Sequence, residues 1–586
     1  MAEVAGLAIG TASLVFQLFE LAVKSHQALY DPQKAAGSFD SLDAQLAVEK
    51  QRLIEWGNAA FVHLKPGDQA SSESYLTDVI ARTLKDIMSN SRRIARIRAK
   101  YLPKLETQDG DSTPQGDGTK SPASRKRYIS FFQVEELFHS VNKNNGTESD
   151  KSSNANTNMA DSLTTRLTLS KRKRWKWTVK DAALVEVITA ELRRGNDSLF
   201  SLLPAVLRES TEQAACASVL IESDNQSMKV IANLDHPQYR DVAAAMRIRQ
   251  AVMEDDQDAP ASEPQCFQSV EEFPESQILL EARGNVRSLA TLKSGADEDS
   301  QTGRTVLVEW KRTAAEGFSM DRQQRLMRLL QQNAIPQRFR TLHCVGSFRV
   351  SQGQHDESLG VLFDIPHTAS GNIDLITLHD IISAPKKKKP PLGDRFHLAH
   401  TLANAVHELH ASSWLHKNIR SANVIFFREH AETTTDATQG IPLPNRDPFL
   451  VGFDYARPAG TQEISENPEL AALEVDLYHH PKYQFGREER YRPPFDVYSL
   501  GIMLLEIGAW RPVHTFQKQG QTIEAFRQRL FQHLVPRLGP EMGVIYQGAV
   551  AACLSDALDD GAGLVSQPHQ TKFRRRVVDE LRKCYA

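Results

Sequence analysis

The sequence contains little cysteine, little net charge and no repeated or Asn/Gln-rich tract. Its five cysteines are scattered without a C-x-x-C pair, which excludes a disulfide framework and a paired-cysteine zinc site and predicts reduced thiols in the cytoplasm. A formal net charge of -3 argues against a nucleic-acid partner, and no segment offers an amyloid motif. At 586 residues, with 40% apolar and 24% charged residues, the chain is expected to form several globular domains.

No apolar run reaches the length of an ordinary membrane-spanning helix, which needs about 20 residues. Residues 4–19 carry no charge but number only sixteen, between Glu3 and Glu20. The acidic start does not fit a secretory signal. Two interpretations stay open: a buried first helix of a bundle and, after activation, a helix inserted in a membrane. The residues expected to insert are Leu7, Ile9, Leu14, Val15, Phe16 and Phe19.

Residues 416–423 carry a catalytic-loop pattern without its acid. They read His-Lys-Asn-Ile-Arg-Ser-Ala-Asn, which resembles the protein-kinase loop in which a magnesium-binding Asn follows the Asp of H-R-D by five residues. Asn418 replaces that Asp, and an amide cannot serve as a general base near neutral pH. The loop is therefore expected to be present but unable to accept a proton from a substrate hydroxyl.

Two segments before the loop extend this resemblance. Residues 306–311 have the pattern of a strand that ends on Lys311, as does the kinase strand V-A-I-K, whose Lys contacts nucleotide phosphates. Residues 396–409 have apolar residues at helical spacing and lead into the loop. The order of these segments is that of a kinase.

Two segments after the loop are also similar to a kinase. Residues 449–457 stand where the metal-binding D-F-G is expected, and Gly452 replaces its Asp. A later helical segment carries Asp496, at the place of the kinase Asp that holds the catalytic loop. The resemblance covers residues 276–586 and implies a two-lobed α+β fold in which His416 and Asp496 are scaffold residues of the loop.

Further parts of a phosphoryl-transfer site are missing. Residues 279–293 contain only Gly284, whereas a phosphate-covering loop needs several glycines, and residues 321–332 contain no Glu to pair with Lys311. We therefore expect a pseudokinase and not an enzyme, with no metal and no required cofactor. Two interpretations stay open for Lys311 and Asn423: scaffold positions without a ligand, or a site for ATP without metal.

The first part of the chain has helical periodicity interrupted by polar stretches. Apolar residues recur at helical spacing in residues 41–56, 74–99 and 179–192. The last of these segments is expected to end at residues 196–199. Residues 107–124 and 142–158 are rich in small and polar residues and are predicted to be disordered loops. An all-α helical bundle is predicted for residues 1–215.

Four short motifs follow the glycine-containing apolar start. They are Gln-Arg-Leu-Ile-Glu-Trp-Gly at 51–57, Arg-Trp-Lys-Trp at 174–177, Asn-Asp-Ser-Leu at 196–199 and Leu-Pro at 203–204. Together they resemble the fungal HeLo domain, known from a prion-associated incompatibility system. The resemblance implies an all-helical module that becomes membrane-active when its first helix is released.

A basic and aromatic cluster precedes the last helix of this part. It consists of Lys171, Arg172, Lys173, Arg174, Trp175, Lys176 and Trp177. Near an anionic membrane each cation adds about 1 kcal/mol before screening, so the cluster is a candidate lipid contact. The other interpretations are a solvated helix entry and a nuclear-localisation-like run.

Residues 216–275 are predicted to link the two parts. They include the acidic, proline-bearing stretch 254–260. The bundle and the kinase-like part are therefore expected to be separate folding units that move relative to each other.

These features together predict a switch. A kinase-like part that transfers phosphate poorly is expected to be regulated by an unknown upstream activator protein and to control the bundle in turn. The released bundle is expected to self-associate and to move from the cytoplasm to an anionic plasma membrane, as an effector of fungal incompatibility or regulated cell death.

Two rival hypotheses belong to other classes. One is a soluble adaptor whose bundle binds homotypically and never contacts lipid. The other is an active divergent Ser/Thr kinase in which Asp454, two positions late for D-F-G, holds the metal.

Overall fold

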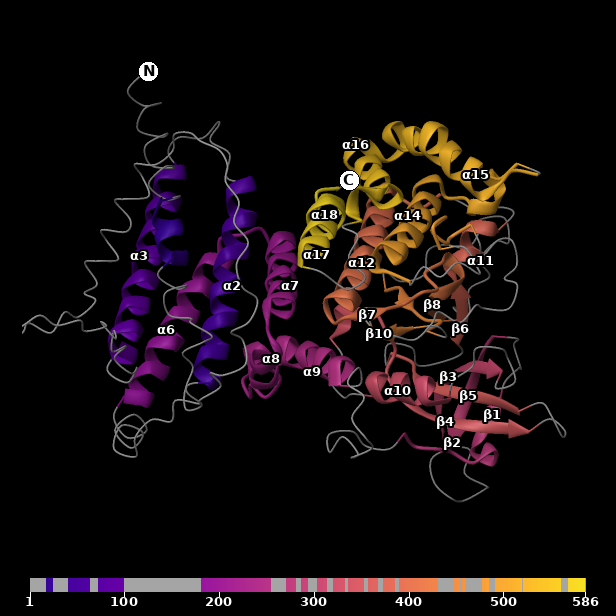
Figure 1. Ribbon diagram of the computed structural model, residues 1–586, viewed down its shortest axis with the longest axis horizontal. Coiled ribbons are helices and arrows are strands. Elements are labelled where there is room, and N and C mark those ends of the chain that lie inside the picture. The colour runs from indigo at the N-terminus through magenta and orange to yellow at the C-terminus, as the bar shows by residue number, and fades with distance from the viewer. Residues whose placement is uncertain are drawn as a thin grey trace, which may run out of the picture.

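The computed structural model divides into a helical N-terminal part and a C-terminal part of sheet and helices (Figure 1). It describes residues 17–24, 40–63, 72–99, 181–254, 270–280, 286–293, 303–312, 320–331, 336–351, 357–366, 373–384, 389–429, 447–453, 456–458, 477–483, 491–518, 520–559 and 567–584.

The N-terminal bundle is built around three long helices. They are α2 (Asp40–His63), α3 (Ser72–Ala99) and α6 (Ala182–Ser201). Each turns an apolar stripe inward, because residues three and four apart share one helix face. The shared core contains Leu53 and Trp56 of α2, Ile87 of α3 and Leu192 of α6, all buried. The predicted all-α bundle is confirmed for the described part of this region.

The short helical segment at residues 17–24 packs into the same core. Leu18 and Ala22 are buried, and the ring of Phe19 lies 6.2 Å from that of Trp56, centroid to centroid. A Cβ on Gly57 would lie 2.1 Å from the Phe19 ring, so any larger residue there would force the Phe19 ring to move. No helix within the described ranges is long and apolar enough to cross a membrane.

Helix α6 is longer than its periodicity predicts. It does not end at residues 196–199 but continues to Ser201. The reason is that Asn196, a residue that often ends helices, is buried and donates to the Glu49 carbonyl oxygen at 3.0 Å and to a Glu49 carboxylate oxygen at 2.8 Å. Leu199 and Phe200 then return to the apolar core.

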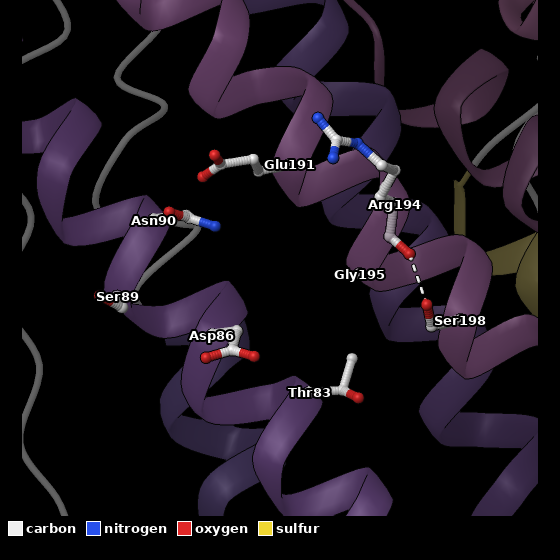
Figure 2. A pocket seen from close by; sticks show the side chains of 8 residues that line it. All are labelled: Thr83, Asp86, Ser89, Asn90, Glu191, Arg194, Gly195 and Ser198. Carbon is white, nitrogen blue, oxygen red and sulfur yellow. Dashed lines mark hydrogen bonds between the residues drawn. The ribbon is translucent and has the colours of Figure 1, made fainter.

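A shallow groove of about 470 Å³ marks the crossing of α3 and α6. Figure 2 shows side chains of both helices bordering it. A Cβ on Gly195 would lie 2.9 Å from Ile87 Cγ1, so the two helices approach closely beneath it. The lining side chains are those of Thr83, Asp86, Ser89, Asn90, Glu191, Arg194 and Ser198. The groove is lined by polar side chains and by charges of both signs, as is common on a solvent-exposed protein surface.

The described residues 216–254 of the predicted linker 216–275 are largely helical. Helix α7 (Ala205–Glu222) crosses the expected end of the bundle at residue 215, and α8 (Asn225–Ala232), the short η3 (Pro237–Tyr239) and α9 (Arg240–Glu254) follow it. They lie between the bundle and the C-terminal part (Figure 1). The stretch 255–260 lies outside the described residues.

One continuous apolar core joins these helices to the C-terminal part. It includes Leu220 of α7, Ile231 of α8 and Met246 of α9 together with Leu402 and Phe573 far along the chain. Burial of apolar area is the main favourable term in folding. The helices of the predicted linker therefore pack on the C-terminal part, and relative motion of the two parts stays a prediction.

The C-terminal part begins with a five-stranded antiparallel sheet. Its strands are β1 (Ile278–Leu280), β2 (Arg287–Lys293), β3 (Gly303–Arg312), β4 (Cys344–Ser351) and β5 (Glu357–Asp364), in the order β1-β2-β3-β5-β4. Helix α10 (Met320–Leu330) packs beside β4. The short η4 (Glu275–Gln277) and η5 (Gln337–Phe339) flank these elements.

The rest of the C-terminal part is mainly helical. Its larger helices are α11 (Leu378–Ser383), α12 (Leu392–Ala411), α14 (Pro493–Ala509), α15 (Ile523–Arg529), α16 (Val535–Leu554), α17 (Gln567–Phe573) and α18 (Asp579–Arg582). Short strands β6 (Ile373–Thr377), β8 (Val424–Glu429) and β9 (Phe449–Leu450) form one small sheet, and β7 (Trp414–Leu415) pairs with β10 (Arg457–Pro458). Helix α14 is buried from Pro493 to Gly508.

The remaining helical segments of this part are short. Three are 3-10 helices, namely η6 (Ser421–Asn423), η7 (Val513–Phe516) and η9 (Asp556–Leu558). Two are π-helical, namely η8 (Leu530–Leu534) and η10 (Arg574–Val578).

Candidate functional site

The first turn of α14 holds the loop between β7 and β8 in place. The Asp496 carboxylate accepts the backbone N–H groups of His416 and Lys417, each at 2.8 Å, and the Tyr491 hydroxyl at 2.7 Å. His410 Nε2 lies 3.1 Å from the same carboxylate. Burial alone would raise the pKa of Asp496, but the hydrogen bond and charge of His410 outweigh it and hold this pKa below its usual value. Residue Lys417 needs this support, since its φ is 65°.

A second buried carboxylate holds the far end of the loop. The Ser421 hydroxyl lies 2.9 Å from the Tyr478 hydroxyl, which donates to Glu506 at 2.7 Å, and Glu506 also accepts the Val513 N–H at 2.7 Å. Burial raises the pKa of Glu506 to about 7, although these hydrogen bonds oppose the shift. Glu506 therefore titrates near neutral pH.

The substitution Glu506→Gln is expected to remove part of the pH dependence of stability. A carboxyl whose pKa is raised by folding stabilises the folded state below its unfolded pKa, and that stabilisation is lost as the pH rises through about 7. The loss corresponds to about 3 kcal/mol. Glutamine stays neutral, so the variant should gain stability relative to the unaltered protein between pH 5 and pH 8, measured by denaturant unfolding. A stability difference independent of pH would contradict this assignment.

Neither predicted catalytic position carries a carboxylate. The Asn418 amide is directed to the Gly452 carbonyl oxygen at 3.4 Å. Gly452 has a φ of +83°, and a Cβ there would lie 2.6 Å from the Asn423 side chain. Phe453 packs against His416, with 4.3 Å between ring centroids. Asp454 lies outside the described residues.

The two predicted nucleotide-binding residues are already engaged with other side chains. Lys311 Nζ lies 2.7 Å from a Glu309 carboxylate oxygen. Asn423 Oδ1 accepts from Arg287 at 2.7 Å, and Asn423 Nδ2 donates to the Asn418 carbonyl oxygen at 2.8 Å. We call Arg287, Glu309, Lys311 and Asn423 the Arg287 cluster. It joins strands β2 and β3 to the loop.

Glu309 is the negative centre of the Arg287 cluster. Its carboxylate lies 3.8 Å from Arg287 and also accepts the Gly452 backbone N–H. Burial would raise the pKa of Glu309, but Lys311 and Arg287 outweigh it and hold this pKa well below its ordinary value. The carboxylate is therefore ionised and shared between two cations.

Sequence reasoning missed Arg287 and Glu309. A signal for Glu309 was present, because residues two apart in a strand point to the same face, which places Glu309 beside Lys311. Arg287 lies directly opposite Glu309 in the β2–β3 register. That register depends on the turn between the strands and is not visible in the sequence.

Several predicted residues fall outside the described part of the chain. These are Leu7, Ile9, Leu14, Val15, Phe16, Lys171, Arg172, Lys173, Arg174, Trp175, Lys176 and Trp177, together with the stretches 107–124 and 142–158. Of the residues predicted to insert in a membrane, Phe19 is described and is half-buried in the bundle.

A buried ion pair connects the bundle directly to the C-terminal end of the chain. Arg574 Nη1 donates to a Glu55 carboxylate oxygen at 3.0 Å and to the Ser218 hydroxyl at 2.9 Å, and Arg574 Nη2 contacts the other Glu55 oxygen. Burial would raise the pKa of Glu55, but the hydrogen bond and charge of Arg574 hold it below its ordinary value. We call this the Glu55–Arg574 contact.

A second buried arginine reinforces this interface. Arg338 Nε donates to Glu408 of α12 at 2.8 Å, and Arg338 Nη2 lies 2.8 Å from Cys216 Sγ of α7 and 3.3 Å from the Asp241 carbonyl oxygen of α9. Helices α7 and α9 are thus tied to α12 through one side chain.

The fold and the site define a two-part protein, an all-helical region followed by a curled antiparallel sheet with helices. Residues 6–234 match the family model described as HeLo, prion-inhibition and propagation. This confirms the HeLo prediction for the N-terminal part and extends it beyond residue 215. Residues 319–580 match the model of a domain of unknown function, DUF7580, which carries no kinase description. No curated protein matches the chain.

Proposed function

We propose that the C-terminal part is a kinase-like regulator without phosphoryl-transfer activity, and that it controls the HeLo-type bundle. One observation carries the proposal: the loop is held in place by Asp496, yet the positions of the general base and of the metal carboxylate are Asn418 and Gly452. A scaffold kept in shape without its reactive groups fits a binding or regulatory role.

The arrangement around the loop supports the kinase-like interpretation. An antiparallel sheet precedes a mainly helical region, as in the two-lobed kinase fold that the sequence resembles. Lys311 lies near the end of β3, and the loop carries Asn423 next to β8. Fold likeness alone does not assign function, so the proposal rests on the residues at the site.

The Glu55–Arg574 contact supports control of the bundle. Glu55, Trp56 and Gly57 are consecutive in α2. Glu55 binds Arg574, whereas Trp56 and Gly57 contact Phe19 of the first helix. The residue of α2 that binds Arg574 and the residues of α2 that contact Phe19 therefore lie within one helical turn. Loss of the Glu55–Arg574 contact would act on the same turn that holds Phe19.

The HeLo match suggests a role in fungal incompatibility or a related form of cell death. In the proposed mechanism an upstream activator protein separates the two parts, after which the bundle self-associates and its first helix enters an anionic membrane. The protein would then move from the cytoplasm to the plasma membrane. Any such trigger must favour the separated state, because a ligand with equal affinity for both states shifts nothing.

A soluble adaptor is the second candidate. It is favoured by the burial of Leu18 and Ala22 in the bundle core, which membrane insertion would have to undo at a cost in apolar burial. The substitution Leu14→Lys separates the two hypotheses. It should abolish membrane activity of an effector, since a charge in lipid is costly, whereas an adaptor whose bundle tolerates the change keeps its protein partners.

Phosphoryl transfer by the full chain is expected to be undetectable. Loss of the general base alone removes about 10²–10⁴-fold in rate, and the metal carboxylate is missing as well. The measurement is transfer of labelled phosphate from ATP to generic protein substrates and to the chain itself, with magnesium and with manganese. Lys311→Ala is the control for contaminating kinases. Transfer that disappears in Lys311→Ala would establish the active divergent kinase and overturn the proposal.

A further inference from the structure

Arg287 reaches from the sheet to the loop. Its side chain, 8% exposed, starts on β2 and donates to the Ala422 carbonyl oxygen at 3.0 Å and to Asn423 Oδ1 at 2.7 Å. Hydrogen bonds with a charged donor are among the stronger ones, and the planar guanidinium fork fixes two acceptors at once. Strand β2 is therefore fastened to the loop at this point.

A kinase-like fold implies a magnesium nucleotide between the sheet and the loop, and the residues present do not fit one. Asn423 Oδ1 is the amide oxygen that a metal would require, but it already accepts from a guanidinium. Lys311, expected to contact phosphate, pairs with Glu309, which is 2% exposed. The Gly452 N–H also points to Glu309. The groups that would bind metal and phosphate are thus already engaged with Arg287 and Glu309.

Charge reinforces the misfit. A magnesium ion at Asn423 would lie within a few ångströms of the Arg287 guanidinium, and like charges at such a distance repel strongly where water is excluded. Moving Arg287 away would leave the buried Asn423 oxygen without its strongest donor and Glu309 with one cation fewer. Desolvated polar groups without partners are costly.

We propose that Arg287 is a built-in cation that takes the place of the magnesium nucleotide and permanently joins β2 and β3 to the loop. The regulatory state of this part is then set by protein contacts and not by ATP, which answers the open question about Lys311 and Asn423. The inference rests on the proposed kinase-like interpretation of the site.

The test compares the full chain with Arg287→Ala and with a matched control, Arg304→Ala. Arg304 belongs to β3 of the same sheet, is 54% exposed and pairs with Asp364 at 2.9 Å, so its loss removes only a surface ion pair. The measurements are thermal unfolding and hydrogen exchange of residues 286–293 and 416–426. Each protein is measured alone, with ATP, and with ATP and magnesium.

Arg287→Ala is expected to lower the midpoint of thermal unfolding by about 3–6 °C and to speed exchange in both segments at least about tenfold. The control should change the midpoint by less than about 2 °C. Nucleotide at about 5 mM should leave the midpoint of the unaltered protein in place, whereas a dissociation constant of about 0.1 mM would raise it by about 2–4 °C.

Two results would overturn the inference. One is stabilisation of the unaltered protein by magnesium ATP that is lost in Lys311→Ala. The other is unchanged exchange of residues 416–426 in Arg287→Ala. Should Arg287→Ala fail to fold, Arg287→Lys keeps the charge without the fork and should show faster exchange in the same two segments, while unchanged exchange there would again contradict the proposal. Nucleotide binding without phosphoryl transfer would contradict this inference but remain compatible with the proposed function. Phosphoryl transfer that requires Lys311 would contradict the proposed function.

Discussion

Arg574→Glu is expected to separate the bundle from the C-terminal part. The substitution places a second carboxylate against Glu55 and removes the donor that Ser218 and Glu55 share. Breaking a buried ion pair in this way costs about 3–5 kcal/mol. Hydrogen exchange in α2 and α7 should rise, and small-angle scattering should report a larger radius of gyration, while the sheet keeps its protection.

Two further variants make this result specific. Arg576→Glu changes the same charge at an exposed position of the same segment and should leave both measurements unaltered. The exchanged pair Glu55→Arg with Arg574→Glu restores opposite charges and should recover part of the lost protection, because coupled residues do not behave additively. Equal effects of Arg574→Glu and Arg576→Glu would show that the contact does not hold the two parts together.

Gly452→Asp is expected to destabilise the protein without creating activity. The substitution introduces the carboxylate that a D-F-G motif would carry at this position under the proposed interpretation, but the backbone has a φ of +83° and the new Cβ would lie 2.6 Å from the Asn423 side chain. Strain at such a φ costs about 1–2 kcal/mol, and overpacking adds about 1–3 kcal/mol. Denaturant unfolding should therefore show a loss of about 2–5 kcal/mol, and phosphoryl transfer should stay absent even with Asn418→Asp added.

Gly520→Asp is the control that isolates backbone strain from the steric clash. Gly520 has a φ of +72°, and a Cβ there would meet nothing within 4 Å. The difference between the two losses in unfolding free energy measures the steric cost of a side chain at Gly452 against Asn423. Equal losses would mean that the loop has room for a carboxylate, and phosphoryl transfer by the Gly452→Asp, Asn418→Asp protein would mean that the site was two substitutions from catalysis.

The elements with strong periodicity could be predicted from the sequence. The segments 41–56 and 74–99 correspond to α2 and α3. The predicted starts lie within two residues of the observed ones, but α2 continues seven residues beyond its predicted end, to His63. The predicted end of α6 was wrong. Asparagine often ends a helix, but here the Asn196 side chain binds Glu49 of another helix. A tertiary partner of this kind overrides local propensity.

The contacts that carry the proposed function are long-range, and the sequence could not reveal them. Arg574 and Glu55 are 519 positions apart, and Arg287 and Asn423 are 136 apart. Nothing in their local patterns distinguishes these arginines from surface residues. Helices α7 and α8 were missed for a related reason, since their apolar faces pack on the C-terminal part, whose position no local pattern specifies.

Dye release from anionic liposomes tests the central claim most directly, namely that the C-terminal part restrains a membrane-active bundle. The account predicts release by full-length Arg574→Glu, little release by the unaltered protein, by Arg576→Glu and by the exchanged pair, and loss of release when Leu14→Lys is added to Arg574→Glu. No release by Arg574→Glu, in a protein whose α2 exchange shows that the contact is broken, would contradict the membrane effector and favour the soluble adaptor.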